Sequence, residues 1–322
     1  MTYVVKPSKG DFLLFTVMNL AGYNDNNDYP NFYPLRSKVR EQFAREINNP
    51  HVLEFYRLWL QKGVHDHPPW VTLVDIQRKE LGEPVSNNRH SEQIRQTLDK
   101  FSESVGFDQE YEKLLPEYLG ICSQVEGILG KVPMEDILNK AWEFPANFGV
   151  VIVPRPLDKP YHGDGPRAGN FAVSLIGPGI IQRAPTFEDP NLRHLVAHEV
   201  SHSYAEVIEK EIMRVAQERG IVDKINEFAR RQKAKNYGGM VVLIETMMRA
   251  IQQRYIDPHL QLGKVYPGSI EKKLVDEHER GGFEHIFKFD EVIRRHKENP
   301  KGTLAEELVD ASVYLIGGRD GN

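Results

Sequence analysis

The chain has 322 residues, of which 40% are hydrophobic and 27% charged, and its formal net charge is −5 at pH 7. This length is enough to bury a substantial core, as one large domain or two smaller ones. The acidic balance argues against a protein that works mainly by holding nucleic acid, because such proteins usually carry a basic face. The single cysteine, Cys122, excludes an intrachain disulfide, so the expected fold does not depend on an oxidising compartment.

An apolar run from Phe12 to Met18 lies near the N-terminus, after Lys6 and Lys9. The run is far shorter than the roughly 20 apolar residues of a membrane span, and no other run reaches that length. Basic residues before a short apolar run also occur in signal sequences, but Asp11 borders this one and no small-residue cleavage site follows. We therefore expect no membrane span and a cytoplasmic location.

The first 140 residues are predicted to be mainly helical. Amphipathic helices are expected at 35–47 and 51–63, and a longer helix is expected to begin near Phe107. The apolar residues of the longer segment recur at helical spacing, which indicates a core-facing side. His65 and His67 stand before two prolines, which predicts a loop, with a second metal site as the alternative.

The pattern changes after Trp142. Residues 148–154 and 171–179 are short β-branched or alternating runs that end in Gly and Pro, which predicts two strands. A Gly- and Pro-rich loop with His162 and Asp164 lies between them.

A long helix is expected after these strands, because Asp189 can cap it and Pro190 can occupy its first position. It is expected to run to about Gly220. The stretch at 223–236 is highly charged and predicts a solvated helix, whereas 238–255 predicts a more apolar one. One or two further helices are expected near the C-terminus, including 303–316.

The helix expected after Pro190 carries three histidines at intervals of four residues, His194, His198 and His202, which a helix places on one stripe. The last two belong to His198-Glu199-Val200-Ser201-His202, which matches H-E-x-x-H. In that motif both imidazoles bind one Zn²⁺, and the glutamate takes a proton from the bound water. The motif lies in a predicted helix after two strands, which favours a metal site over a solvated histidine face. His194, one turn earlier, is expected beside the site rather than in it.

Strand, edge strand and H-E-x-x-H helix follow one another in the same order in zincin metallopeptidases, and residues 145–255 resemble a zincin. The chain as a whole is similar to a group of predicted bacterial metallopeptidases through "FLLFTVMNLAGYND", "HEVSH" and "ETMMRAIQQRY". The metzincin subgroup needs Gly and His where this chain has Ala205 and Ile208, so the resemblance is to gluzincin-like members with a glutamate third ligand.

The resemblance implies an α+β fold with a mainly helical N-terminal region at 1–140 and a zincin-like catalytic region at 141–322. That region would hold a small mixed sheet, the motif helix and a ligand helix. It further implies a zinc peptidase with one Zn²⁺ per chain, Glu199 as general base and a peptide or protein substrate. The strand at 171–176 could be the edge to which an extended peptide adds, and an ordinary internal strand is the alternative.

The third ligand is predicted to be Glu245. A residue of the motif helix approaches the ion from a poor direction, and the charged stretch that follows predicts solvated carboxylates. These arguments set aside the other candidates, Glu206, Glu209, Asp223 and Glu227. Glu245 is flanked by apolar residues and is costly to bury without a partner, which Zn²⁺ would supply. A helix-surface pair with Arg249 is the alternative.

Other functions stay open at this stage. A zinc hydrolase acting on a non-peptide amide, a non-catalytic zincin-like binding or regulatory module, and a helical interaction protein without metal are the rivals. Glu199 favours catalysis over the binding module, because a scaffold that needs only the metal has no use for this carboxylate. Four residues could stabilise an oxyanion, and the sequence does not choose among Tyr204, Tyr237, Tyr255 and His162.

Overall fold

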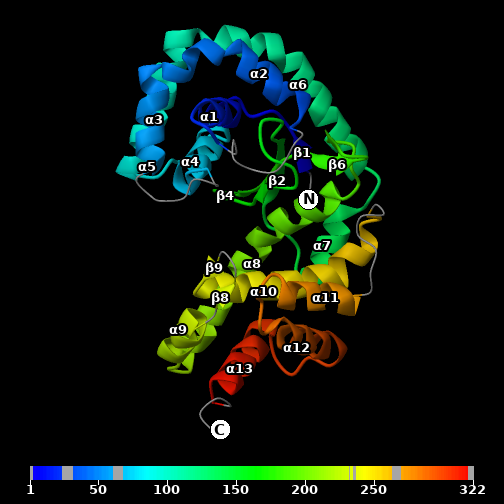
Figure 1. The fold of residues 1–322 in the computed structure, drawn as a ribbon. Coiled ribbons are helices and arrows are strands. Elements are labelled where there is room, and N and C mark those ends of the chain that lie inside the picture. Colours follow the sequence, from blue (N-terminus) through cyan, green and yellow to red (C-terminus); the bar gives the residue numbers. More distant parts are fainter. Residues whose placement is uncertain are drawn as a thin grey trace. The chain divides into compact units, whose positions relative to one another are not determined.

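The structure is a computed structural model that describes residues 3–23, 32–60, 68–231, 233–234, 237–262 and 270–317, with the backbone alone at 233–234, 237–238 and 316–317. It is a mixed α+β fold, mostly helical with one small mixed sheet, as expected (Figure 1). The chain forms two compact units. One comprises Met1–Lys131 and Asn147–Val200, and the other comprises Val132–Ala146 and Ser201–Asn322. This division differs from the expected boundary after residue 140, because the strands belong to the same unit as the N-terminal helices.

The first unit contains helices at the predicted segments 35–47, 51–63 and from Phe107, together with helices that were not individually predicted. In chain order, the helices of this unit are α1 (Lys9–Leu20), α2 (Pro34–Gln42), η1 (Ala44–Asn48), α3 (Pro50–Leu60), α4 (Trp70–Glu80), α5 (Arg89–Val105) and α6 (Phe107–Leu129). The segment expected at 35–47 is divided between α2 and the 3₁₀ helix η1. The segment with His65 and His67, which was predicted to be a loop with a second metal site as the alternative, lies outside the described residues.

The apolar run near the N-terminus forms the central helix of this unit, α1. All ten side chains from Asp11 to Leu20 are buried, so the helix is covered on every side. Its first turn is capped by Ser8, whose hydroxyl accepts a hydrogen bond of 3.1 Å from the backbone N–H of Asp11. The run is therefore part of the hydrophobic core.

The sheet of the first unit has five strands, β1 (Tyr3–Val5), β2 (Gly149–Pro154), β3 (Gly163–Asp164), β4 (Arg167–Ala168) and β5 (Phe171–Ile176). Strands β1, β2 and β5 are parallel neighbours, and β3 and β4 pair antiparallel with the other side of β5. Both predicted strands are thus present. The edge-strand interpretation of 171–176 is wrong, because β5 has hydrogen-bonded neighbours on both sides. A hairpin of β6 (Gly179–Ile181) and β7 (Ala184–Thr186) follows.

The helix predicted to carry the histidines is α8 (Leu192–Glu218), which has 27 residues. Asp189 precedes it, and its Oδ1 accepts a 2.9 Å hydrogen bond from the N–H of Asn191. The chain leaves the helix just before Gly220, whose φ of +65° suits a glycine. The division between the two units falls within α8, after Val200.

The second unit is built from helices on both sides of α8 in the sequence: α7 (Met134–Trp142), α9 (Val222–Arg231), α10 (Met240–Ile251), η2 (Gln252–Ile256), η3 (Asp257–His259), α11 (Ile270–Glu279), α12 (Ile286–Glu298) and α13 (Leu304–Gly317). Short strands β8 (Lys233–Ala234) and β9 (Tyr237–Gly238) pair between α9 and α10. Among the described residues, the C-terminal part holds three helices where one or two were expected. Within the described residues, no helix has both the length and the apolar character needed to cross a membrane.

Candidate metal centre

The H-E-x-x-H residues lie in the first half of α8, where the helix is continuous. His198 and His202 are one turn apart and both are partly exposed. Glu199 lies between them in sequence and is only 5% exposed. An ion from solvent can reach the two partly exposed imidazoles. The carboxylate of Glu199 beside them is largely shielded from solvent.

Glu245 comes from α10, where apolar neighbours bury its side chain to 3% exposure. Its Oε1 lies 3.4 Å from Nε2 of His202. Two ligands at about 2.0–2.1 Å from a tetrahedral Zn²⁺ are separated by about 3.3 Å. The two donor atoms are therefore spaced as ligands of one ion would be.

The three predicted ligands lie together. One donor atom each from His198, His202 and Glu245 can be chosen so that all lie within 4.8 Å of one another. Among the described residues, this is the group of three or more His, Cys, Asp or Glu side chains that could hold a metal ion. Two imidazole nitrogens and one carboxylate oxygen form a donor set that suits zinc and leaves a fourth position open. His194 is not part of the group.

Arg249 forms the pair with Glu245 that was the alternative to a metal role for this glutamate, and it contacts the other carboxylate oxygen. Its Nε lies 3.3 Å from Glu245 Oε2, whereas His202 faces Oε1. Nη1 of Arg249 donates to both carboxylate oxygens of Glu277 in α11, at 3.1 and 3.2 Å, and the amide of Gln253 also donates to Glu277. Ligating carboxylates are commonly held in this way by a second group. The arginine pair and a metal site are thus compatible.

The rejected third-ligand candidates have other surroundings. Glu206 accepts a 2.7 Å hydrogen bond from Lys210 on the surface of α8. Burial, with Glu206 nearby, raises the pKa of Glu209 above its ordinary value. Asp223 and Glu227 are exposed on α9. The predicted solvated character holds for this side of α9 only, because its other side is buried through Ile225, Phe228 and Ala229.

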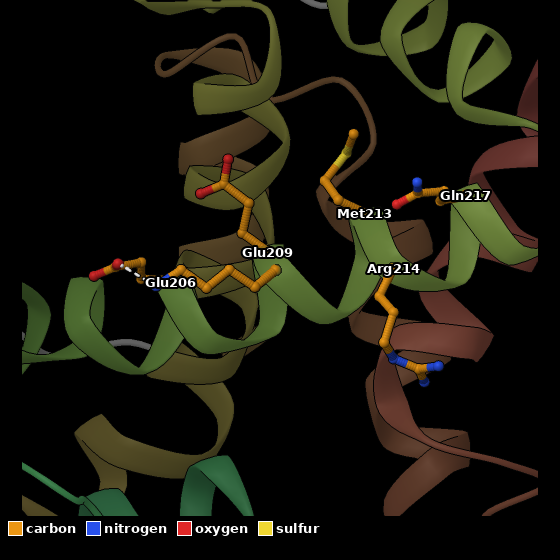
Figure 2. A pocket seen from close by; sticks show the side chains of 6 residues that line it. Glu206, Glu209, Met213, Arg214 and Gln217 are labelled. Atoms are coloured by element: carbon orange, nitrogen blue, oxygen red, sulfur yellow. Dashed lines mark hydrogen bonds and ion pairs between the residues drawn. The ribbon is translucent and has the colours of Figure 1, made fainter.

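A hollow runs along the second half of α8 (Figure 2). All of its lining residues belong to this helix, namely Glu206, Glu209, Lys210, Met213, Arg214 and Gln217. Their charges are largely paired with one another or with adjacent residues, such as Arg214 with Glu211 and Glu218. The hollow contains none of the predicted site residues.

The candidate oxyanion stabilisers fall into different environments. Tyr204 is fully buried, its hydroxyl donates to Asn139 Oδ1 at 2.7 Å, and burial raises its pKa. Tyr255 is partly exposed, with the Lys297 ammonium 4.8 Å from its ring centroid. The side chain of Tyr237 lies outside the described residues. Tyr204 is thus engaged in packing, and the structure does not select an oxyanion donor from this set.

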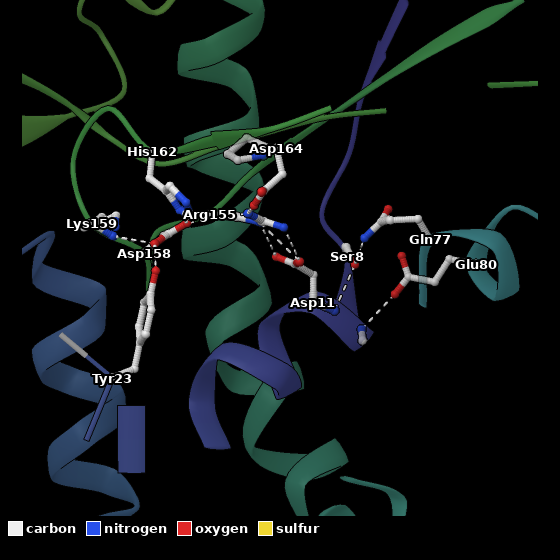
Figure 3. A network of polar contacts seen from close by, with 12 residues as sticks. Ser8, Asp11, Tyr23, Gln77, Glu80, Arg155, Asp158, Lys159, His162 and Asp164 are labelled. Carbon is white, nitrogen blue, oxygen red and sulfur yellow. Dashed lines mark hydrogen bonds and ion pairs between the residues drawn. The ribbon is translucent and has the colours of Figure 1, made fainter. Parts of the chain in front are cut away.

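A buried ionic network in the first unit was not predicted (Figure 3). Arg155 follows β2 directly, and its guanidinium contacts three carboxylates, those of Asp11, Asp158 and Asp164. His162 joins the network through a 2.6 Å contact between its Nδ1 and Asp158. One sequence signal was available: Asp11 and Arg155 each border a strongly apolar segment, and a buried charge at such a place needs a partner.

The pKa values of the network show which charges its interior supports. Burial raises the pKa of Asp11 to about 6, although Arg155 opposes the shift. Burial acts in the same direction on Asp158, but the charge and hydrogen bond of His162, together with Arg155, outweigh it and lower the pKa to about 2. Burial alone would lower the pKa of His162, and Asp158 and Asp164 reverse this and raise it. The His162–Asp158 pair is therefore held in its charged form.

Comparisons of the chain with protein families, with curated proteins and with solved structures gave no match.

Proposed function

We propose that the protein is a zinc-dependent hydrolase, most simply a peptidase, with His198, His202 and Glu245 as metal ligands and Glu199 as general base. The observation that carries this proposal is the proximity of Glu245 to the histidines. Three residues chosen as ligands from sequence, one of them 43 positions after His202, come within 4.8 Å of one another.

Each residue has a role that its surroundings support. The two imidazoles and Glu245 Oε1 would hold the ion, while Arg249 fixes the orientation of the glutamate through Oε2. When bound, Zn²⁺ makes a water molecule acidic near neutral pH and polarises a carbonyl group. Glu199 would accept a proton from the attacking water and pass it to the leaving nitrogen as the amide C–N bond breaks.

The substrate cannot add to β5 as an extra strand, because both sides of β5 are already hydrogen-bonded. The peptide specificity inferred from the resemblance therefore needs a different binding surface. A non-catalytic zincin-like module is the second candidate, and it shares the metal ligands. Glu199 distinguishes the two, since only catalysis needs this carboxylate next to the ligands.

The first test is metal content. Protein purified without a histidine tag should bind about one zinc per chain, and His198→Ala or His202→Ala should lose it, because too few protein ligands remain. His194→Ala, one turn earlier on the same helix, is the matched control and should keep the metal. Stoichiometric zinc in the His198→Ala/His202→Ala double variant would reject the site.

The second test separates metal from chemistry. Glu199→Gln should keep zinc and lose about 10²–10⁴ in turnover on a peptide library, since the amide has nearly the same shape and cannot act as the base. Glu206→Gln, on the exposed part of the same helix, should turn over normally. A wild-type protein that binds zinc and hydrolyses neither peptides nor other amides would favour the binding module.

A further inference from the structure

Gly163, the first residue of β3, lies against the side chain of Glu199. A Cβ atom built on Gly163 would lie 2.5 Å from Glu199 Oε1, 2.9 Å from Glu199 Cδ and 2.7 Å from Leu195 Cδ1. Separations this short do not occur between real side chains. The φ angle of Gly163 is not in the left-handed region, so the backbone itself would accept alanine. A side chain at this position would therefore force the ends of Glu199 and Leu195 to move, and the space beside Gly163 is filled mainly by the Glu199 carboxylate.

The residues on either side of Gly163 face the other way. Side chains of an extended segment alternate between its two faces, so His162 and Asp164 lie opposite the Glu199 side. Figure 3 shows both directed toward Arg155 and Asp158. Asp164 accepts a hydrogen bond from Nη1 of Arg155, and His162 contacts Asp158 at 2.6 Å.

The network anchors this segment to the core of the first unit. Arg155 Nε donates to both carboxylate oxygens of Asp11 in α1 at 3.2 Å, and the buried hydroxyl of Tyr23 donates to Asp158 at 2.9 Å. The backbone of the segment is fixed as well, because Gly177 N–H donates to the His162 carbonyl at 2.7 Å. Residues 162–164 are thus held from one face by buried charges and present bare backbone on the other.

We propose that residues 162–164 form a positioning element for the general base. The Arg155 network holds the segment in place, and the absent side chain of Gly163 lets the Glu199 carboxylate lie against its backbone. Gly163 is a positioning residue, since it acts on the reaction only through Glu199. This inference rests on the proposed function, in which Glu199 is the base.

The experiment compares Gly163→Ala with Gly120→Ala. Gly120 lies in α6 of the same unit, where an added Cβ would meet nothing within 4 Å. Gly163→Ala should keep its zinc and its KM and lose about 100-fold in kcat, the cost of a base displaced by about 1 Å. Gly120→Ala should retain wild-type kcat. Wild-type kcat in a zinc-loaded Gly163→Ala protein would overturn the proposal.

A double-mutant cycle with Glu199→Asp tests whether the effect passes through the base. The aspartate is one methylene shorter, so it vacates part of the space beside Gly163. In that background, Gly163→Ala should lower kcat far less than its fold-change in the wild type. Equal fold-changes in both backgrounds would overturn the proposal, because they would show that the glycine acts independently of Glu199.

A melting-temperature cycle with Glu199→Ala needs neither zinc nor activity. Gly163→Ala should lower the melting temperature in the wild type and lower it less when Glu199 is truncated. If an active enzyme showed equal shifts in both backgrounds, the positioning role would fail and the proposed function would stand. If the coupling were present and the wild type did not hydrolyse amides, the proposed function would fail and the positioning role with it.

Discussion

At the scale of single residues, Glu245 connects the sequence to the site most directly. Its carboxylate is 3% exposed and lies between an imidazole and a guanidinium. A buried carboxylate is retained only when its surroundings compensate the lost hydration. Arg249 supplies one part of that compensation, and an ion beside His202 would supply the other.

We expect Glu245→Ala to weaken zinc binding by more than the 10- to 100-fold typical of residues that only orient a ligand, which is the loss expected for Arg249→Gln. The informative result is which of the two variants loses more zinc affinity. Competition with a chelating dye measures the affinity of each. Circular dichroism should show that α10 persists in both. An unchanged zinc affinity in Glu245→Ala would mean that another carboxylate completes the site.

The His162–Asp158 pair gives a pH prediction. The raised pKa of His162 means that the folded protein binds its proton more tightly than the unfolded chain does. The stability that this histidine contributes is fully present below its ordinary pKa of 6.5 and is lost as the pH rises through the folded value. The difference in unfolding free energy between wild type and His162→Gln should therefore shrink as the pH rises above 6.5. Urea titrations at several pH values measure it, and a difference that grew instead would contradict the assignment.

At the scale of elements, α8 is held near the motif by residues of α7 and the segment after it. Trp142 Nε1 donates to Ser201 Oγ at 3.2 Å, and its ring stacks on Tyr204 with centroids 5.8 Å apart. The Tyr204 hydroxyl shares Asn139 Oδ1 with the N–H of Ala146. The buried side of α8 is thus fixed by packing, and His198 and His202 lie on its partly exposed side.

Tyr204→Phe should cost about 0.5–1.5 kcal/mol of stability, because one hydrogen bond is lost and the stacked ring remains. Trp142→Ala should cost about 3–5 kcal/mol, since it removes a buried indole. Urea unfolding measures both. Tyr204→Phe should also keep its zinc and its turnover, and a large loss of turnover would assign its hydroxyl to the reaction instead.

The elements that the sequence predicted correctly have local signals. The 3.6-residue periodicity from Phe107 gave α6, and the Asp189-Pro190 pair placed the start of α8 within two residues. The neighbours of β5 have no such signal, because strand pairing is decided by long-range contacts. The strands that cover β5 are two residues each and lie in a segment whose composition predicts a loop.

At the scale of the whole molecule, the division of the chain was the least predictable feature. β1 pairs with β2 in the register Tyr3 to Val150, so residues far apart in sequence share one sheet. Arg155 and Asp11, which meet in the core, are separated by 144 positions. Local periodicity carries no information on contacts between residues this far apart in sequence. The boundary expected after residue 140 was placed where helical patterns give way to strands, and it therefore did not take these contacts into account.

Metal binding should stabilise the folded protein as a whole. A ligand that binds only the native state at 100 times its Kd adds about 2.7 kcal/mol. With an unfolding entropy of about 2.1 cal/mol/K per residue, this corresponds to a rise in melting temperature of roughly 4 °C for a chain of 322 residues. Zinc should produce the rise in differential scanning calorimetry, a chelator should reverse it, and His198→Ala/His202→Ala should show neither effect. The same rise in the double variant would place the ion elsewhere.

The short strands that cover β5 have a consequence for association between copies of the protein. A long, regular edge strand offers a row of unpaired backbone groups to the edge of another molecule. Here the outer segment consists of two-residue strands separated by Gly165 and Pro166, and Pro166 has no N–H to donate. The carbonyl of Pro166 is already used by Val173 N–H at 3.0 Å. On this side, β5 therefore offers no long, regular edge with which another molecule could pair.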